Sequence, residues 1–347
     1  MTAAPAASTD RSDHPPVSVV MPVRNEERHL SAAVRRVLDQ QYPGQLELIL
    51  SIGPSTDRTH QIAEGLAATD PRVRIVDNPE GWTPAGLNRA IEAARHDIIV
   101  RVDGHGELTP GYIATAVELI EETGAANVGG FMDAQGRSTF ERAVATAYTS
   151  HLGLGGGAFH LATSHEGPAD TVYLGTFRRD ALAKVGGFDE TMHRAQDWEL
   201  NYRLRKAGEQ IWFSPELRVT YRPRSGWVAL AKQFYNTGRW RREVVRRHPE
   251  TASLRYLAPP LTVLGLTAGW SGGIAGLARW AAGRRGPLSV LLLLGFLAPL
   301  VYTSVVVGGA ASLRRPLPGK VRALLPAVLI VMHLAWGLGF LVGLGKR

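Results

Sequence analysis

The stretch Ile98–Glu107, IIVRVDGHGE, decides the fold that we expect for this chain. Its apolar beginning is typical of a short strand buried on both faces, and the glycines after Val102 indicate a sharp turn at the carboxyl end of that strand. In open α/β sheets, ligands bind just outside the carboxyl ends of the strands. We therefore expect Asp103 and His105 to emerge together at the rim of a sheet.

Asp103 and His105 are candidate metal ligands. A carboxylate and an imidazole one residue apart can bind one divalent cation, and the phosphates of a substrate can complete the coordination shell. The alternative is that both are ordinary turn residues that cap a strand. The stretch alone is compatible with either interpretation.

The remainder of the first 225 residues alternates between strand patterns and amphipathic helix patterns. The expected strands are residues 17–21, 46–50, 73–76, 98–102, 128–132, 173–177 and 210–213, and the expected helices are residues 26–38, 59–67, 85–94, 111–123, 180–185 and 196–207. This alternation predicts an α/β domain with a parallel sheet and crossover helices. Residues 151–170, which are rich in glycine and histidine, are expected to form a long loop over the active-site edge.

Three apolar rows follow residue 255 of this 347-residue chain. They are residues 257–277, 288–311 and 324–344, and each is long enough to cross the roughly 30 Å hydrocarbon core of a bilayer. We therefore expect about three transmembrane helices. Pro259 and Pro260 interrupt the first row together with several glycines, so that row is alternatively re-entrant or tilted.

An arginine-rich segment precedes these rows and supplies much of the net charge of +8. Residues 227–247 mix aromatic and apolar side chains with arginines, which is typical of a helix in the membrane interface; a packed surface helix is the alternative. The cluster predicts contact with anionic lipid and a cytoplasmic α/β domain. Nucleic acid is the competing partner, but no nucleic-acid-binding motif accompanies the charge. The densest arginines are Arg239, Arg241, Arg242, Arg246, Arg247 and Arg255.

Composition divides the chain into four segments. Residues 1–16 lack an apolar core, so they are no secretory signal, and we expect a disordered tail. Residues 17–225 form the α/β domain, residues 226–255 a basic amphipathic interface segment, and residues 256–347 the transmembrane region. The absence of cysteine excludes disulfides, thiolate metal sites and cysteine nucleophiles.

Six motifs occur in order along the chain. They are VSVVMPVRNEE at 17–27, PSTDRT at 54–59, RVDGHGE at 101–107, GTFRR at 175–179 followed by GGFDE at 186–190, QDWELNYRLRKAG at 196–208, and QFYNTGRW at 233–240. With these motifs the chain resembles the family 2 glycosyltransferases, whose GT-A catalytic domain is a Rossmann-like α/β fold with a mostly parallel sheet. The resemblance covers roughly residues 17–345 and points especially to the membrane-attached bacterial branch that includes succinoglycan-type exopolysaccharide enzymes.

The resemblance implies a site for a nucleotide-sugar donor. The residues that would bind it are Pro22, Arg24, Asn25, Glu26, Asp57, Asn88 and Asp103. Glu26 would accept hydrogen bonds from ribose hydroxyls, whereas Asp57 is alternatively an ordinary turn cap. Asp103 and His105 match the family's Asp-x-Asp metal pair, at which Mn²⁺ or Mg²⁺ would neutralise the diphosphate leaving group. Residues 51–54, Ser-Ile-Gly-Pro, replace the Val-Asp-Asp-Gly of many relatives, so the acid that would recognise a uracil edge is missing.

The resemblance also implies a general base and acceptor contacts. Asp197 matches the aspartate of the family's Glu-Asp motif, with Gln196 in place of the glutamate, and it would deprotonate the acceptor hydroxyl. The alternative is an acid favoured by the dipole at a helix N-terminus. Acceptor or interface contacts are implied for Gly175, Thr176, Arg178, Gln233, Arg239 and Trp240. The last three match the family's Gln-x-x-Arg-Trp motif only with wider spacing.

The leading hypothesis is a multi-pass membrane glycosyltransferase with a cytoplasmic catalytic domain. It would move a sugar, with inversion, from a nucleotide-sugar donor to a lipid-linked or otherwise membrane-bound glycan in cell-surface polysaccharide or glycolipid synthesis. A nucleotidyltransferase is the enzymatic alternative, but it would need a glycine-rich basic loop near its N-terminus. A non-catalytic membrane scaffold is the third hypothesis, and the presence of Asp103, His105 and Asp197 together speaks against it.

Overall fold

The computed structural model describes residues 14–155, 157–161 and 163–345. The chain divides into two compact units, which we call the sheet unit (Met1–Asp133 and Gly157–Tyr221) and the helical unit (Ala134–Gly156 and Arg222–Arg347). Residues 1–13 of the predicted disordered tail lie outside the described residues.

The sheet unit contains a nine-stranded mixed sheet in the order β3-β2-β1-β4-β8-β6-β9-β5, with β7 paired to β9. Its parallel part consists of β3 (Val73–Asp77), β2 (Leu46–Ile52), β1 (Val17–Val23) and β4 (Ile98–Arg101). The antiparallel pairs involve β8 (Tyr173–Arg178), β6 (Asn127–Ala134), β9 (Ile211–Tyr221), β5 (Glu107–Leu108) and β7 (Gly167–Pro168). The predicted α/β fold class is confirmed.

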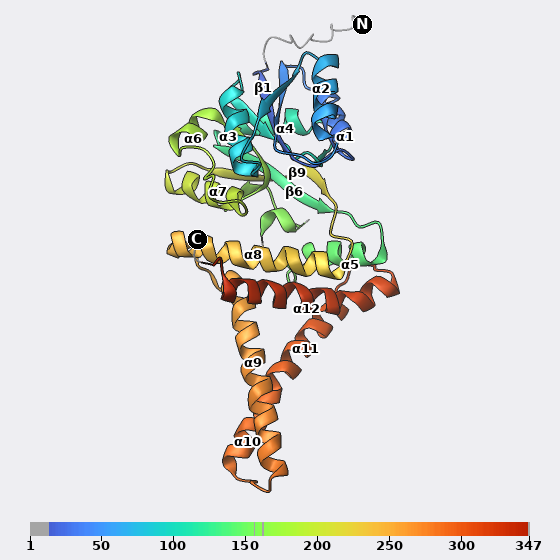
Figure 1. The fold of residues 1–347 in the computed structure, drawn as a ribbon, viewed down its shortest axis with the longest axis vertical. Helices are drawn as coiled ribbons and strands as arrows, with labels where there is room; N and C mark the ends of the chain where they lie inside the picture. Colours follow the sequence, from blue (N-terminus) through green and yellow to red (C-terminus); the bar gives the residue numbers. More distant parts are fainter. Residues whose placement is uncertain (1–13, 156, 162, 346–347) are drawn as a thin grey trace, which may run out of the picture. The chain divides into compact units, whose positions relative to one another are not determined.

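Helices cover both faces of this sheet (Figure 1). One face packs against α1 (Leu30–Leu38), α2 (Thr59–Thr69) and α4 (Tyr112–Thr123), and the other against α3 (Thr83–Ala93), α6 (Arg179–Lys184) and α7 (Gln196–Lys206). Because helices cover both faces of the sheet, side chains on both faces of β1 are buried, and Val19 and Val20 are fully inaccessible to solvent. This double burial explains why its sequence reads as a continuous apolar run.

The register of β1 and β4 brings two loops together at one edge of the sheet. Val20 pairs with Arg101, and the Val102 N–H donates to the Val20 carbonyl at 3.0 Å. The segment that carries Asp103 therefore leaves the sheet beside the segment that follows Met21. This edge is the carboxyl edge at which α/β proteins place their ligands.

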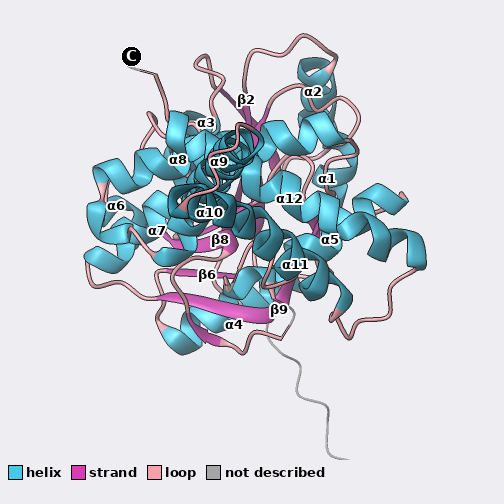
Figure 2. Ribbon diagram, turned by 90° about the horizontal axis from the view of Figure 1, so that it is seen from below, coloured by secondary structure: helices cyan, strands magenta, loops and turns pink. Residues whose placement is uncertain are grey.

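The long apolar helices of the described chain all belong to the helical unit. In Figure 2, each labelled element of this unit is drawn as a helix. Its elements are α5 (Thr139–Tyr148), α8 (Trp227–Arg247), α9 (Leu254–Ala281), α10 (Pro287–Leu293), η3 (Leu294–Phe296), α11 (Leu297–Ala311) and α12 (Gly319–Val342). Among the described residues, three segments are long and apolar enough to cross a membrane: Leu254–Ala281, Pro287–Ala311 and Gly319–Val342. The three predicted apolar helices are thus present, and α9 continues through Pro259 and Pro260.

Several predicted boundaries were wrong. Residues 134–156 group with the helical unit, although we had assigned them to the α/β domain, and they contain the unpredicted helix α5. The helix expected from residue 26 begins only at Leu30, because the Glu26 carbonyl closes a turn by accepting from the N–H groups of His29 and Leu30. The predicted strand 210–213 continues to Tyr221, since it pairs with β7 and then with β5. The predicted loop 151–170 includes a short 3-10 helix, Ala158–His160, and β7.

Candidate active site

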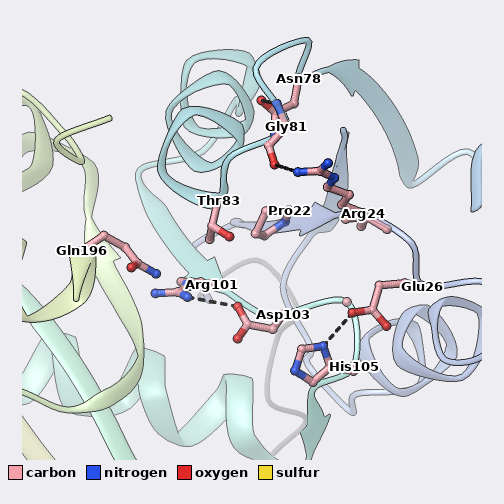
Figure 3. A pocket seen from close by; sticks show the side chains of 12 residues that line it. Pro22, Arg24, Glu26, Asn78, Gly81, Thr83, Arg101, Asp103, His105 and Gln196 are labelled. Atoms are coloured by element: carbon pink, nitrogen blue, oxygen red, sulfur yellow. Dashed lines mark hydrogen bonds and ion pairs between the residues drawn. The ribbon is translucent and has the colours of Figure 1, made fainter. Parts of the chain in front are cut away.

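A cavity of about 200 Å³ lies at the carboxyl edge of the sheet (Figure 3). Four segments line it: the end of β1, the turn before α3, the end of β4, and the first residue of α7. The lining residues are Pro22, Val23, Arg24, Glu26, Asn78, Gly81, Thr83, Arg101, Asp103, Gly104, His105 and Gln196. The structure therefore brings together five predicted site residues, namely Pro22, Arg24, Glu26, Asp103 and His105.

Arg101 is the central cation of this cavity. Its side chain is only 4% exposed, and it forms ion pairs with Asp103, at 3.1 Å, and with Asp197. Both carboxylates are more accessible, at 25% for Asp103 and 38% for Asp197. One buried guanidinium thus holds the candidate metal ligand and the candidate base, and its charge offsets the repulsion between their two carboxylates.

Asp197 reaches the site because of where α7 begins. The helix starts at Gln196, immediately after Ala195, whose backbone is left-handed with φ of 59°. Asp197 therefore lies in the first turn, where the helix dipole favours an anion. Its ion pair with Arg101 shows a tertiary role beyond that of a helix-terminal acid.

Glu26 orients the imidazole of His105. The His105 Nδ1 and the Glu26 Oε1 lie 2.8 Å apart, and the imidazole is 56% exposed whereas Glu26 is 18% exposed. A carboxylate partner of this kind fixes the orientation of a metal-binding histidine. In this structure Glu26 contacts His105, and the contact predicted between Glu26 and ribose hydroxyls stays a prediction.

The residues present fit a divalent cation held jointly with a substrate. Among the described residues, no group of three or more His, Asp or Glu side chains could hold a metal by itself. Asp103 and His105 both line the cavity, so the protein would offer two ligands, and the oxygens of a diphosphate would supply others. Metals that bind nucleotides commonly share their ligands in this way.

A second cation, Arg24, lies across the cavity. Its Nη1 donates to the Gly81 carbonyl at 3.2 Å. Gly81 has φ of 67° in a turn that the Asn78 side chain closes, with Nδ2 donating to the Trp82 carbonyl and Oδ1 accepting from the Gly81 N–H. This arrangement holds a positive charge in the wall of the cavity.

Asp57 and Asn25 join two loops without lining the cavity. Asp57 accepts from the hydroxyl and the N–H of Thr59 and from the N–H of Glu27. These bonds, above all that from the Thr59 hydroxyl, hold the pKa of Asp57 below its ordinary value despite some desolvation. Asn25, with φ of 54°, accepts from the Thr56 N–H at 2.8 Å. Asp57 therefore makes the contacts of a turn cap, which was the alternative interpretation, and its contact with the nucleoside stays a prediction.

Asn88 also has a structural role in place of a cavity contact. Its carboxamide donates to the Phe188 carbonyl and to Glu190, and accepts from the Phe188 N–H at 2.9 Å. These bonds tie α3 to the segment before α7. The predicted donor contact of Asn88 has no counterpart in the lining of the cavity.

The predicted acceptor residues on β8 are part of the sheet. Thr176 is completely buried, and a Cβ at Gly175 would lie 2.3 Å from the Asn127 Oδ1. Arg178 pairs with Asp180 at 2.8 Å. These contacts position strands and helices, and the acceptor contacts of these residues stay a prediction.

Gln233, Arg239 and Trp240 lie on α8 in the helical unit. Arg239 donates from Nε to the Gly343 carbonyl at 2.8 Å, and Trp240 is 7% exposed. Most of the arginine cluster is likewise engaged within the unit. Glu243 accepts from Arg246 and Arg247, and Arg241 lies over the ring of Tyr256.

Sequence reasoning missed three features of the site. Arg101 was read only as one residue of an apolar strand, although a charge inside such a run is itself a signal. Asn78 and Thr83, for which we predicted no role, flank the Gly81-Trp82 turn and line the cavity. Trp82 stacks on His193 with ring centroids 3.9 Å apart and an interplanar angle of 7°. The stack joins the turn that contains Gly81 to the segment that leads to Gln196, and both of these residues line the cavity.

Known proteins resemble this chain in sequence and fold. The sequence model of Glycosyl transferase family 2 matches residues 18–186. The chain is 32% identical over 325 residues to the succinoglycan biosynthesis protein ExoA of Rhizobium meliloti, with 93% of each protein covered. It is 24% identical over 241 residues to the dolichyl N-acetyl-alpha-D-glucosaminyl phosphate 3-beta-D-2,3-diacetamido-2,3-dideoxy-beta-D-glucuronosyltransferase of Methanococcus voltae, with 67% of this chain and 74% of that protein covered.

A solved structure shares the fold. The mannosyltransferase PcManGT from Pyrobaculum calidifontis, in complex with GDP-Man and Mn²⁺, matches with a TM-score of 0.55 and 19% identity. The match covers 94% of this chain and 88% of that chain.

Proposed function

This chain belongs to glycosyl transferase family 2, and from that premise we propose that it is a membrane-bound, inverting, metal-assisted enzyme that transfers a sugar from a nucleotide-sugar donor to a membrane-bound glycan. The observation that carries the proposal is Arg101, which lines the cavity and forms ion pairs with both Asp103 and Asp197. A donor diphosphate and an acceptor hydroxyl need a metal site and a base close together; Asp103 lines the cavity, and Asp197 is joined to it through Arg101.

The donor diphosphate would occupy the side of the cavity formed by Arg24, Asp103 and His105. Arg24 would neutralise phosphate charge and is already held in place by the Gly81 carbonyl. Asp103 and His105 would hold Mn²⁺ or Mg²⁺, which supplies Lewis-acid stabilisation of the departing diphosphate. The Mn²⁺ and GDP-Man of the mannosyltransferase with the same fold support this assignment.

Asp197 would act as the general base. The acceptor oxygen attacks the anomeric carbon from the face opposite the diphosphate, its proton passes to the Asp197 carboxylate, and the bond from the anomeric carbon to the diphosphate oxygen breaks with its electron pair. A single displacement of this kind inverts the anomeric configuration. Arg101 would keep the Asp197 carboxylate oriented for the transfer, because its buried guanidinium has little freedom to move.

The acceptor would be a glycan on a membrane lipid. The helical unit contains three helices that are long and apolar enough to cross a membrane, and α8 begins six positions after β9 ends at Tyr221. A soluble acceptor would not require the catalytic chain to be tied so closely to a bilayer. We propose a multi-pass protein of the cell membrane whose sheet unit lies in the cytoplasm, where nucleotide sugars are made, with a role in polysaccharide or glycolipid synthesis. The similarity to a succinoglycan biosynthesis protein supports that role.

The test uses the full chain in lipid nanodiscs. A panel of UDP-, GDP- and dTDP-sugars would be offered with Mn²⁺ or Mg²⁺ and a bacterial lipid extract, and lipid-phase products would be identified by mass spectrometry. We expect one donor to be consumed with formation of a glycosylated lipid, and product formation by Asp197→Asn that is slower by about 10² or more. Equal transfer to water-soluble sugars and to the lipid fraction would contradict the lipid acceptor. Retention of the anomeric configuration in the product would contradict inversion.

A further inference from the structure

Helix α12 runs alongside α8 in the helical unit, and both helices point in the same direction (Figure 1). Glycines make the contact close. A Cβ at Gly238 would lie 2.0 Å from the Trp336 carbonyl oxygen, and one at Gly339 would lie 1.9 Å from the Tyr235 carbonyl oxygen. The backbones of α8 and α12 are therefore in direct contact.

The contact extends to the end of α12. Arg239 donates to the Gly343 carbonyl at 2.8 Å, and Arg242 donates to the Phe340 carbonyl at 3.3 Å. These carbonyls belong to the last turn of the helix and the residue after it, which have no partners within the helix itself. Arginines of α8 thus supply hydrogen bonds to the C-terminal end of α12.

The depth of α12 in the membrane must then equal the depth of α8. α8 carries Arg239, Arg241 and Arg242 close to its midpoint, and its last turn contains Arg246 and Arg247. A helix with this many charges does not lie across a hydrocarbon core, because each charge would lose its hydration. An amphipathic helix of this composition lies in the headgroup region, and α12 lies beside it.

A second contact independently fixes the middle of α12. The His333 Nε2 lies 2.6 Å from the Leu152 carbonyl oxygen, and its Nδ1 lies 3.1 Å from the Tyr302 hydroxyl. Leu152 follows α5, in the segment Ala134–Gly156 whose two ends both continue into the sheet unit. The ten residues of α5 span only about 15 Å, so this segment does not cross a bilayer and return.

The other two apolar segments differ from α12. In the most apolar stretch of each segment, the buried share is 17% for α9 and 11% for Pro287–Ala311, against 39% for α12. The two pack against each other as a hairpin, with a Cβ at Gly269 only 2.6 Å from the Gly295 carbonyl oxygen. Their remaining apolar side chains face outward, as they do in helices surrounded by lipid.

We infer that α12 does not cross the membrane. The chain crosses twice, through α9 and Pro287–Ala311, while α8 and α12 lie together in the headgroup layer of one leaflet. Both ends of the helical unit, including Gly345, are then on the side from which the chain enters α8. This inference deepens the proposed function, since it rests on the membrane attachment proposed there, and it replaces our expectation of three crossings.

The absence of cysteine makes a direct test possible. Four exposed positions would each receive a single cysteine in the full chain: Glu64 in α2, Ala282 after α9, Arg314 before α12, and Gly345 after it. A membrane-impermeant maleimide would be applied to spheroplasts and to inside-out vesicles. Labelling in detergent controls for the reactivity of each thiol, and donor consumption on the same membranes controls for a folded enzyme.

We expect the cysteines at 64, 314 and 345 to react from one side and that at 282 from the other. Reaction at 345 from the side of 282 would mean that α12 crosses, and it would overturn the inference while leaving the proposed function intact. Reaction at all four positions from one side would overturn both the hairpin and the proposed multi-pass attachment. Because donor consumption is measured in parallel, that last outcome remains distinguishable from loss of the transferase.

Discussion

Arg101 and Asp197 form an ion pair although they lie 96 positions apart in the sequence. Arg101 is the last residue of β4, and Asp197 is the second residue of α7. The same guanidinium also holds Asp103 at 3.1 Å. One buried side chain therefore sets the distance between the group that would bind a metal and the group that would accept a proton.

The first prediction concerns this positioning role. Arg101→Lys keeps the charge but lacks the planar fork that contacts two carboxylates at once, so we expect kcat to fall by about tenfold to a hundredfold while the Kd for the donor changes less. Arg101→Ala should also lower the free energy of unfolding, because it leaves two carboxylates without their partner. The loss should be limited to about 2 kcal/mol, because both carboxylates are partly exposed to water.

Arg74→Lys is the matched control, because Arg74 forms an ion pair with Glu47 at 2.9 Å outside the cavity. This control should leave kcat unchanged. Steady-state kinetics and chemical denaturation measure the two effects separately. An Arg101→Lys enzyme with wild-type kcat would show that the bridge is dispensable.

The second prediction tests the base. Asp197→Asn retains the shape of the side chain and removes the proton acceptor, so kcat should fall by about 10² or more with nearly unchanged donor affinity. Asp180→Asn is a suitable control, since Asp180 also lies in the first turn of a helix and also pairs with an arginine, Arg178. Loss of donor binding in the Asp197 variant, without loss of kcat at saturation, would assign Asp197 to the donor site.

The parallel part of the fold was predictable from sequence because its strands are buried on both faces. β1 and β4 read as apolar runs for that reason, whereas the pairing of Val20 with Arg101 was not evident from the sequence. Helix α5 was missed even though Ser138 and Glu141 form a capping box, a signature that is visible in sequence. The position of α12 beside α8 could not be predicted, because apolar composition is the same for a helix that crosses a bilayer and for one that lies along another helix.

The site was predictable only where a loop follows a strand. Asp103, His105, Arg24 and Glu26 are at strand ends, and the structure brings them into one cavity. Thr176 lies inside a strand, so its neighbours in the sheet determine its burial, and these neighbours are not evident from the motif that contains it.

The third prediction concerns metal removal. Asp103→Ala should abolish transfer and make nucleotide binding independent of added Mn²⁺ or Mg²⁺, because a carboxylate is the stronger ligand for either ion. His105→Ala should retain some activity and need a higher metal concentration for half-maximal rate. Glu26→Gln should raise that metal concentration less, because it only weakens the contact that orients His105. Titration of activity with metal after dialysis against EDTA checks the His105 and Glu26 variants, and nucleotide binding measured with and without added metal checks Asp103→Ala. Full wild-type activity in EDTA would exclude this role for Asp103.

The fourth prediction uses the turn cap at Asp57. Its folded-state pKa is lowered, so the ionised carboxylate stabilises the fold above the ordinary aspartate pKa of about 4, and this stabilisation is lost as the pH falls through the lower folded-state value. The Tm difference between the wild type and Asp57→Asn should therefore be largest at neutral pH and shrink below about pH 4. Donor affinity should be preserved, since the carboxylate contacts Thr59 and Glu27. An unchanged Tm with weakened donor binding would favour the nucleoside contact instead.

The last prediction concerns the stacked pair of Trp82 and His193. Trp82 is the residue before α3 and stays 45% exposed, while His193 lies four positions before Asp197, so the stack connects the Gly81 turn to the segment that carries the base. A stacked aromatic pair contributes about 0.5–1.5 kcal/mol beyond its buried area. Its loss should therefore lower kcat by up to about tenfold in Trp82→Ala.

Trp82→Phe, which keeps an aromatic face, should restore most of the rate, and Trp227→Ala provides a control at another exposed tryptophan. Steady-state kinetics with the identified donor decide the question: equal rates for Trp82→Ala and the wild type would mean that the stack does not position Asp197.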